Sequence, residues 1–300
     1  MISFDGKDIA VHAWEGVGRP RGVVQIAHGM NEYAARYEGF ARRLNAHGYV
    51  VVAEDHRGHG DTDAATLGYA PGDMFADTVG DMALLAQTYR GKYPGLPYAL
   101  FGFSYGSFLT QAFVRRFGYL IDGAVVAGSS RQNALAVAAG RLVANVGGLL
   151  RGKDKPARLV NKIVFGGFGK KFADGEWLSG DAENNARYHA DPYCKFVCSN
   201  NFFASFFRGL AGLYKKDACP PPDLPILLLS GKSDPVGDMG AGVLRLEKYY
   251  RGAGVQDVTV HLIEGSRHEF LNERAHAEEG VAAVLGFLER LSVRTPAAQN

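Results

Sequence analysis

The feature that most constrains the fold of this chain is a regular alternation of strand-like and helix-like segments over residues 1–128. Several strand-like segments are continuous apolar runs, which is typical of strands covered on both faces. An alternation of this kind predicts a parallel sheet wrapped by helices. The strand-like segments are residues 9–14, 23–27, 49–53, 98–103 and 123–127, and the helix-like segments are residues 34–46, 74–93 and 107–117.

The alternation stops over residues 129–222 and then resumes. The interrupting segment is helix-like, glycine-rich and aromatic, and three prolines at 220–222 end it. We therefore predict an α/β core formed by residues 1–128 and 223–300, with an inserted, mainly helical cap at residues 129–222. In the second part of the core, strand-like segments at 226–230 and 258–263 alternate with helix-like segments at 240–252 and 274–291.

The net charge and hydropathy of the chain bear on whether it binds nucleic acid or a membrane. A formal net charge of +2 gives no electrostatic reason to bind nucleic acid. The N-terminus lacks a charged-then-apolar leader, which predicts a cytoplasmic protein. The most apolar stretch, residues 134–150, is interrupted by Arg141 and Asn145 and falls short of the ~20 residues that span a bilayer. Peripheral contact of this stretch with a membrane surface stays open as an alternative, although it lacks a basic polar face.

The cysteines and histidines do not form a recognisable metal-binding pattern. Cys194, Cys198 and Cys219 are an odd number of cysteines, and no histidine pair completes a zinc set with them. His56 and His59 are three residues apart, but no third ligand is spaced to join them. We expect reduced thiols, no metal and no organic cofactor.

A glycine-flanked serine at residues 102–106 (Gly-Phe-Ser-Tyr-Gly) lies where a strand-like segment meets a helix-like one. A serine hydroxyl is a poor nucleophile at neutral pH, so it must be exposed, held in position and given a base. A Gly-x-Ser-x-Gly turn from strand to helix achieves the first two, which predicts Ser104 as a nucleophile. The Tyr105 N–H, at the helix N-terminus, would donate to a developing oxyanion. The alternative is a tight glycine turn with an ordinary capping serine.

A base and an acid for Ser104 are expected on loops that follow the last strands. Among nine histidines, His268 lies in a turn-rich segment directly after the strand-like residues 258–263. Asp234 follows the strand-like residues 226–230, so the chain order is Ser, Asp, His. Asp238 and Glu264 are alternatives for the acid. A second oxyanion donor is expected from the backbone N–H of Met30, after the strand-like residues 23–27.

Four motifs together resemble one branch of a known family. They are residues 28–32 with 36–37 (HGMNE and RY), residues 55–60 (DHRGHG), residues 102–106 (GFSYG) and residues 265–269 (GSRHE). This set resembles the monoacylglycerol lipase and lysophospholipase branch of the α/β-hydrolases. The resemblance implies Ser104 as nucleophile, Asp234 as acid, His268 as base, and the N–H groups of Met30 and Tyr105 as oxyanion hole.

The chain departs from that branch at three positions. Members usually carry Met at the position of Tyr105 and often His at that of Phe103, and Tyr33 replaces the more common His after Glu32. The first two changes affect the packing of the serine turn rather than its chemistry. The predicted cap does not closely resemble that of well-studied members, so the family does not specify the substrate.

The expected activity is hydrolysis of a small acyl ester, such as a monoacylglycerol or a lysophospholipid, through an acyl-enzyme on Ser104. A thioesterase, an acyltransferase or a peptidase would use the same residues, and a ligand-binding receptor on this fold is a further alternative. Four aromatic residues of the predicted cap are candidates for an acyl-binding wall, although their helical spacing favours packing of the cap on the core. They are Phe202, Phe203, Phe206 and Phe207.

Overall fold

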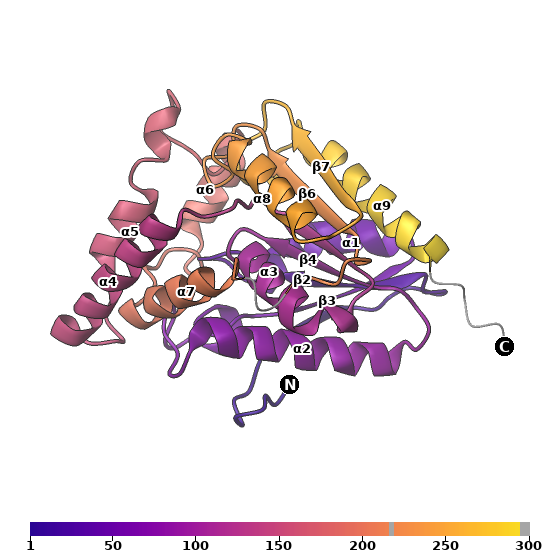
Figure 1. The fold of residues 1–300 in the computed structure, drawn as a ribbon, viewed down its shortest axis with the longest axis horizontal. Helices are drawn as coiled ribbons and strands as arrows, with labels where there is room; N and C mark the ends of the chain where they lie inside the picture. The colour runs from indigo at the N-terminus through magenta and orange to yellow at the C-terminus, as the bar shows by residue number, and fades with distance from the viewer. Residues whose placement is uncertain (216–218, 295–300) are drawn as a thin grey trace.

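The structure is a computed structural model that describes residues 1–215 and 219–294. Within these residues, helices cover both faces of a seven-stranded sheet (Figure 1). The strand order is β1-β3-β2-β4-β5-β6-β7, with β1 antiparallel to β3 and all other neighbours parallel. The strands are β1 (Val11–Trp14), β2 (Gly22–Ala27), β3 (Tyr49–Glu54), β4 (Tyr98–Phe103), β5 (Gly123–Ala127), β6 (Ile226–Gly231) and β7 (Val258–Ile263).

Burial along the strands follows the sequence pattern. Every residue of the five central strands, β2 to β6, is buried, whereas the edge strands β1 and β7 are only partly buried. The continuous apolar runs therefore belong to strands covered on both faces, as predicted. Two separate hydrophobic clusters fill the space between the sheet and its two helical layers.

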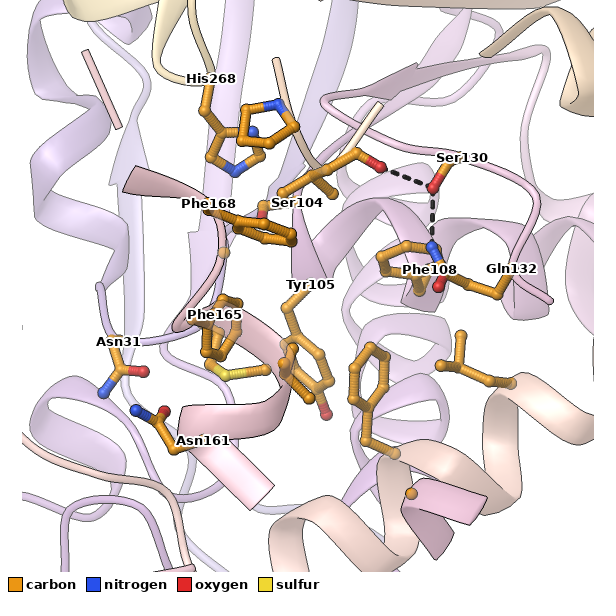
Figure 2. A pocket seen from close by; sticks show the side chains of 18 of the residues that line it. Asn31, Ser104, Tyr105, Phe108, Ser130, Gln132, Asn161, Phe165, Phe168 and His268 are labelled. Carbon is orange, nitrogen blue, oxygen red and sulfur yellow. Dashed lines mark hydrogen bonds between the residues drawn. The ribbon is translucent and has the colours of Figure 1, made fainter. Parts of the chain in front are cut away.

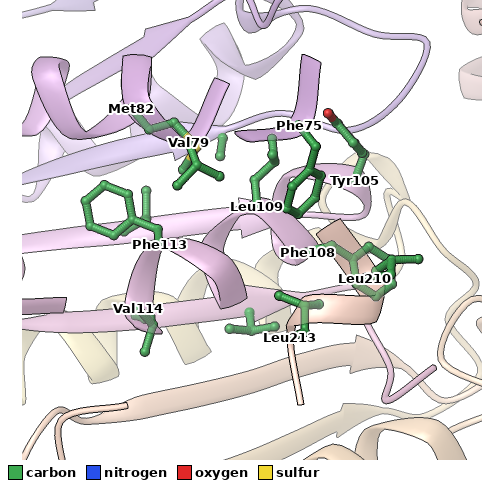
Figure 3. Packing of buried hydrophobic residues seen from close by; sticks show 14 of the residues in the cluster. Phe75, Val79, Met82, Tyr105, Phe108, Leu109, Phe113, Val114, Leu210 and Leu213 are labelled. Atoms are coloured by element: carbon green, nitrogen blue, oxygen red, sulfur yellow. The ribbon is translucent and has the colours of Figure 1, made fainter. Parts of the chain in front are cut away.

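The helices of the core divide between the two faces of the sheet (Figure 1). Side chains of α1 and α9 share one hydrophobic cluster, and those of α2, α3 and α8 share the other. Figure 3 shows the second cluster, where Phe75, Val79 and Met82 of α2 pack near Leu109 and Phe113 of α3. The bounds are α1 (Glu38–Ala46), α2 (Met74–Lys92), α3 (Tyr105–Phe117), α8 (Ala241–Gly252) and α9 (Ala277–Arg294).

Three predicted helices differ in the structure by two residues or more at one or both ends; the last, expected at residues 274–291, is observed at Ala277–Arg294. The expected helix at 34–46 begins with a 3-10 turn, Ala34–Tyr37, before α1 starts. Helix α3 begins at Tyr105, two residues earlier than expected, because the serine turn leads directly into the helix. The predicted core and cap also extend over residues 295–300 and 216–218, which lie outside the described residues.

The segment between β5 and β6, which we call the insertion, is helical over much of its described length. It contains α4 (Ala134–Arg151), α5 (Arg158–Phe165), α6 (Ala182–Ala190) and α7 (Asn200–Gly212). Helix α7 packs on the core, where a side chain at Gly209 would overlap the ring of Phe75. In Figure 1, α4 and α5 lie farther out at the same end of the molecule.

Helix α4 has two contrasting faces. One carries small residues: a side chain at Gly140 would overlap the Phe207 ring, and one at Gly147 would overlap Asn200, so this face lies close against α7. The other face is exposed and apolar, as described below. Within the described residues, α4 is the one helix whose length and composition would suffice to cross a membrane, with a mean hydropathy of 1.3.

Candidate active site

Ser104 lies in a sharp turn between β4 and α3. Its backbone φ of 52° and ψ of −118° are unusual for a residue with a side chain, and the turn leaves Ser104 partly exposed between buried neighbours. Both flanking glycines are required here. A side chain at Gly106 would overlap the carbonyl oxygen of Ala27, and one at Gly102 would overlap the Thr110 hydroxyl. The two glycines therefore permit the strained backbone that leaves Ser104 partly exposed.

His268 and Asp234 are hydrogen-bonded to each other. The His268 Nδ1 lies 2.8 Å from the Asp234 Oδ2, and both side chains are buried. The Asp234 carboxylate also accepts a hydrogen bond from the Val236 N–H at 2.8 Å. Because Nδ1 donates to the carboxylate, the Nε2 of His268 is the nitrogen left for a further partner. The loops after β6 and β7 bring the two residues together, as their positions in the sequence suggested.

The charges around His268 change its proton affinity. Burial lowers the pKa of His268, but the adjacent Asp234 carboxylate outweighs that effect, with smaller contributions from Glu269 and Glu32. As a result the pKa of His268 lies above its usual value of 6.5. The other two candidate acids have different partners: Asp238 pairs with Arg245 and Glu264 pairs with Lys232.

Ser104 and His268 open into one cavity of about 830 Å³. Met30 and Tyr105, whose backbone N–H groups were expected to form the oxyanion hole, also line it. Figure 2 shows His268 and Ser104 at one end of this cavity, with Phe165 and Phe168 of the insertion below them. The cavity therefore brings together the five residues predicted for the triad and the oxyanion hole, four as lining and Asp234 through its bond to His268.

Comparison with known proteins agrees with this geometry. The sequence matches the family described as serine aminopeptidase, S33, over residues 18–275. The chain belongs to this family. It is an α/β-hydrolase of the monoacylglycerol lipase-like branch.

Three relatives illustrate the similarity. Human monoglyceride lipase is 26% identical over 273 residues, which cover 89% of this chain and 82% of the relative. The monoacylglycerol lipase of Mycolicibacterium smegmatis is 28% identical over 275 residues, which cover 89% of this chain and 88% of the relative. A solved structure of a thermostable carboxyl esterase from Bacillus coagulans in complex with glycerol matches with a TM-score of 0.85, at 26% identity and 97% coverage of both chains.

A buried charge network lies behind the site of this hydrolase. The Arg36 guanidinium contacts the Glu32 carboxylate at 2.8 Å and the Glu269 carboxylate at 2.8 and 3.1 Å. Glu32 also accepts hydrogen bonds from the Gly29 N–H and the Tyr37 hydroxyl. Burial alone would lower the pKa of Arg36, but the two carboxylates raise it, so this cation stays charged.

This network joins the loop that carries Met30 to the loop that carries His268. Glu32 holds the peptide next to Met30, and Glu269 directly follows His268 in the chain. Sequence reasoning included Glu32, Arg36 and Glu269 in the motifs but assigned them no role. The available signal was their position: charged residues directly beside the predicted oxyanion loop and the predicted base.

His28, directly after β2, contacts the 55–60 segment. His28 is buried, its Nδ1–H donates to the Gly29 carbonyl at 2.8 Å, and its Nε2 accepts the His56 N–H at 2.9 Å. Burial lowers the pKa of His28 well below its usual value, so the ring is neutral. Its ring stacks on that of His56, with centroids 4.0 Å apart. These contacts connect the oxyanion loop to the segment after β3.

One group of side chains has the spacing of metal ligands. Atoms of His12, Asp55 and Asp61 lie within 4.8 Å of one another. However, the Asp55 carboxylate already accepts the backbone N–H groups of Ala34 and Asp61, at 2.7 and 2.8 Å, and contacts His12 at 3.3 Å. This arrangement is that of a carboxylate fixing a loop.

The four candidate phenylalanines of α7 divide into two pairs. Phe206 and Phe207 line the cavity. Phe202 and Phe203 are fully buried and lie outside the cavity lining, so their expected role as an acyl-binding wall is wrong. Phe202 packs on Tyr105 of the serine turn, with ring centroids 4.9 Å apart, and Phe203 packs on Phe202 at 5.5 Å. One turn of helix separates the pairs, so the second reaches the cavity while the first fastens α7 to the core.

Proposed function

We propose that this hydrolase cleaves carboxylic esters through an acyl-enzyme on Ser104. The observation that carries the proposal is the opening of a strained serine turn and a buried His–Asp pair into one largely apolar cavity. The lipase and esterase names of the relatives support the same reaction class.

The reaction would proceed in two steps. His268 Nε2 takes the proton of Ser104 as its oxygen attacks the acyl carbonyl, and the Asp234 carboxylate stabilises the imidazolium that forms. The backbone N–H groups of Met30 and Tyr105 stabilise the oxyanion, a contribution of about 3 kcal/mol per donor in comparable sites. His268 then protonates the leaving alcohol, and in the second step it activates the water that releases the acid.

The shape of the cavity favours a single-chain lipid ester as substrate. Its volume of about 830 Å³ exceeds what a short acyl group needs, and its walls are mainly apolar. Polar side chains lie at two parts of the lining: Ser130 and Gln132, whose amide donates to the Ser130 hydroxyl at 2.7 Å, and, apart from them, Asn31 and Asn161 (Figure 2). We assign the apolar walls to the acyl chain and the part formed by Ser130 and Gln132 to a small alcohol such as glycerol. The apolar walls include Val143, Val160, Phe165, Phe168, Phe206 and Phe207.

We infer that residues 129–222 act as a cap that meets a lipid surface through α4 and α5. The outer face of α4 exposes apolar side chains at helical spacing, and α5 adds two more. They are Leu135, Leu142, Val146 and Leu149 of α4 with Leu159 and Ile163 of α5. Exposed basic residues flank this face, namely Arg151, Lys153, Arg158 and Lys162, which favours an anionic lipid surface. The cytoplasmic location expected from the sequence stays a prediction.

The test is a chain-length series of p-nitrophenyl esters and monoacylglycerols with wild type, Ser104→Ala and Ser205→Ala. Ser205 is a buried serine of α7 outside the cavity lining, so it is a matched control for removing a hydroxyl. We expect Ser104→Ala to lose at least about 10⁴-fold in kcat with an unchanged melting temperature. Wild-type turnover by a folded Ser104→Ala protein would disprove the proposal. Faster turnover of acyl thioesters or peptides than of esters would reassign the substrate class.

A further inference from the structure

A short segment of the insertion is fastened to the loop that carries His268. We call this segment, residues 172–181, the strap. The Arg267 guanidinium contacts the Asp174 carboxylate at 2.8 Å and the carbonyls of Glu176 and Ser179 at 2.6 and 3.2 Å. Two backbone N–H groups add to this: that of Glu269 donates to the Leu178 carbonyl at 2.7 Å, and that of Gly180 donates to Glu273 at 2.6 Å. The strap is therefore joined to the histidine loop by several hydrogen bonds.

The strap places an indole on the imidazole of His268. The ring centroids of Trp177 and His268 are 5.2 Å apart, and Trp177 also lines the cavity. Phe103, from the serine turn, packs on the same imidazole with centroids 4.7 Å apart. His268 is consequently only 2% exposed, and two aromatic rings from different parts of the chain limit its rotation.

Trp177 also contacts the wall of the cavity. Its ring stacks on Phe165 of α5, with centroids 5.9 Å apart and planes 11° apart, and meets Phe168 at 5.2 Å. The indole thus lies between the residues assigned to the acyl chain and the residue assigned as base.

We propose that Trp177 is a positioning residue for His268, holding the imidazole so that Nε2 stays directed at Ser104. This proposal rests on the proposed function, since it takes His268 as the base for Ser104. The base must accept a proton from Ser104 and then deliver it to the leaving group, so a small rotation of the ring would slow both transfers. A displacement of about 1 Å in such a site can cost on the order of 100-fold in rate.

The charged groups around Trp177 and His268 determine the pKa of His268 that a pH titration would measure. Asp234, Glu269 and Glu32 face His268 and raise its pKa, while burial lowers it. Arg36 pairs with the two glutamates, and Arg267 adjoins His268 in the chain. On the strap side, Glu176 adjoins Trp177 and contacts His189 at 3.2 Å, and Asp174 is held by Arg267.

The kinetic test compares Trp177→Ala, Trp177→Phe and Phe168→Ala on p-nitrophenyl acetate and octanoate. We expect Trp177→Ala to lower kcat about 10–100-fold on both esters, and Trp177→Phe to recover to within about 3-fold of wild type because a ring still covers the imidazole. Phe168→Ala removes a wall residue, so its effect should appear in KM and grow with acyl length. A wild-type kcat for Trp177→Ala on acetate, or an effect confined to KM on octanoate, would overturn the proposal.

A second measurement tests the contact between Trp177 and His268 directly. It needs no substrate and keeps the indole of Trp177 in place. The chain has two tryptophans, so Trp14→Phe leaves Trp177 as the sole indole. An imidazolium in contact with an indole quenches its fluorescence, so we expect emission to fall as pH drops through a midpoint above 6.5. Adding His268→Gln should abolish this transition, whereas adding His189→Gln should retain it. A titration unaffected by His268→Gln would contradict the contact.

The two proposals can fail separately. Turnover by Ser104→Ala would disprove the proposed function, even if the fluorescence titration followed His268. An inactive Ser104→Ala together with an unaffected kcat in Trp177→Ala would leave the function standing and reject the positioning role alone.

Discussion

Two parts of the same insertion differ sharply in how they attach to the molecule. The strap is held by charged and backbone hydrogen bonds to the histidine loop, centred on Arg267. Helices α4 and α5 instead present an outer apolar face to solvent, where Leu135 and Leu149 are 82% and 85% exposed. Directional bonds suit a part that must hold a catalytic geometry, whereas exposed apolar surface suits a part that must meet a lipid. The insertion therefore contains two different parts: the strap, which is bonded to the loop that carries His268, and helices α4 and α5, whose exposed face is proposed to meet the lipid.

The largest effect is expected at the acid that orients the base under the strap. Asp234→Asn should lower kcat about 10⁴-fold, because the amide stabilises the wrong tautomer of His268. Glu264→Gln is the matched control, since Glu264 is an exposed carboxylate that pairs with Lys232 and was an alternative acid. Steady-state kinetics on p-nitrophenyl butyrate measures both. Equal losses in the two variants would remove Asp234 from its proposed role.

Releasing the strap should have the next largest effect. Arg267→Gln removes the contacts to Asp174 and to two strap carbonyls, hydrogen bonds of a charged group that are worth about 1.5–3 kcal/mol each at most. We expect a lower melting temperature and a kcat reduced about 10-fold, because the indole loses its support. Arg42→Gln, which breaks an exposed pair with Glu38 outside the cavity lining, should change neither. An unchanged kcat in Arg267→Gln would show that the contacts between Arg267 and the strap do not affect catalysis.

The pH dependence of kcat/KM should follow the same base. His268 must be neutral to accept the serine proton, so activity should fall as pH decreases through its pKa, which lies above 6.5. Since the folded-state pKa is raised, the pair stabilises the fold below the unfolded pKa and loses this contribution as pH rises through the folded pKa. An acid limb with a midpoint clearly below 6.5 would contradict the effect of the Asp234 carboxylate on the pKa of His268.

The smallest effect on the chemistry is expected on the outer face of α4. Leu135 and Leu149 lie outside the cavity lining, so the double change Leu135→Ser and Leu149→Ser should leave hydrolysis of dissolved p-nitrophenyl butyrate within about 2-fold. Binding to vesicles of mixed neutral and anionic phospholipid should fall by on the order of 100-fold or more, because burying each leucine is worth about 1.5–3 kcal/mol. Vesicle sedimentation measures this. Wild-type binding by the double variant would show that this face is not the docking surface.

The sequence was most informative where local rules decide the structure. The five buried strands appear in the sequence as apolar runs. The serine turn is recognisable from its two glycines, because a side chain at Gly102 or Gly106 would overlap neighbouring atoms. The positions of Asp234 and His268, on the loops after β6 and β7, were sufficient to predict them as acid and base. These features depend on a few neighbouring residues, which a sequence displays directly.

The sequence was least informative where contacts join distant residues. Trp177 and His268 are far apart in the chain, and nothing near Trp177 indicates that it covers a base. The helical spacing of the four phenylalanines of α7 was visible in the sequence, but only the position of the cavity along α7 shows that Phe206 and Phe207 line it and that Phe202 and Phe203 do not. Such contacts depend on how the insertion returns to the core.

The central claim is that Ser104 carries the acyl group, and the most direct test is to trap it. Rapid acid quenching of the enzyme during p-nitrophenyl octanoate turnover, followed by peptide mass spectrometry, should show one octanoyl adduct on the peptide that contains Ser104. The yield should rise in Asp234→Asn if that change slows deacylation more than acylation. An adduct on any other residue, or a p-nitrophenol burst that persists in Ser104→Ala, would contradict the account.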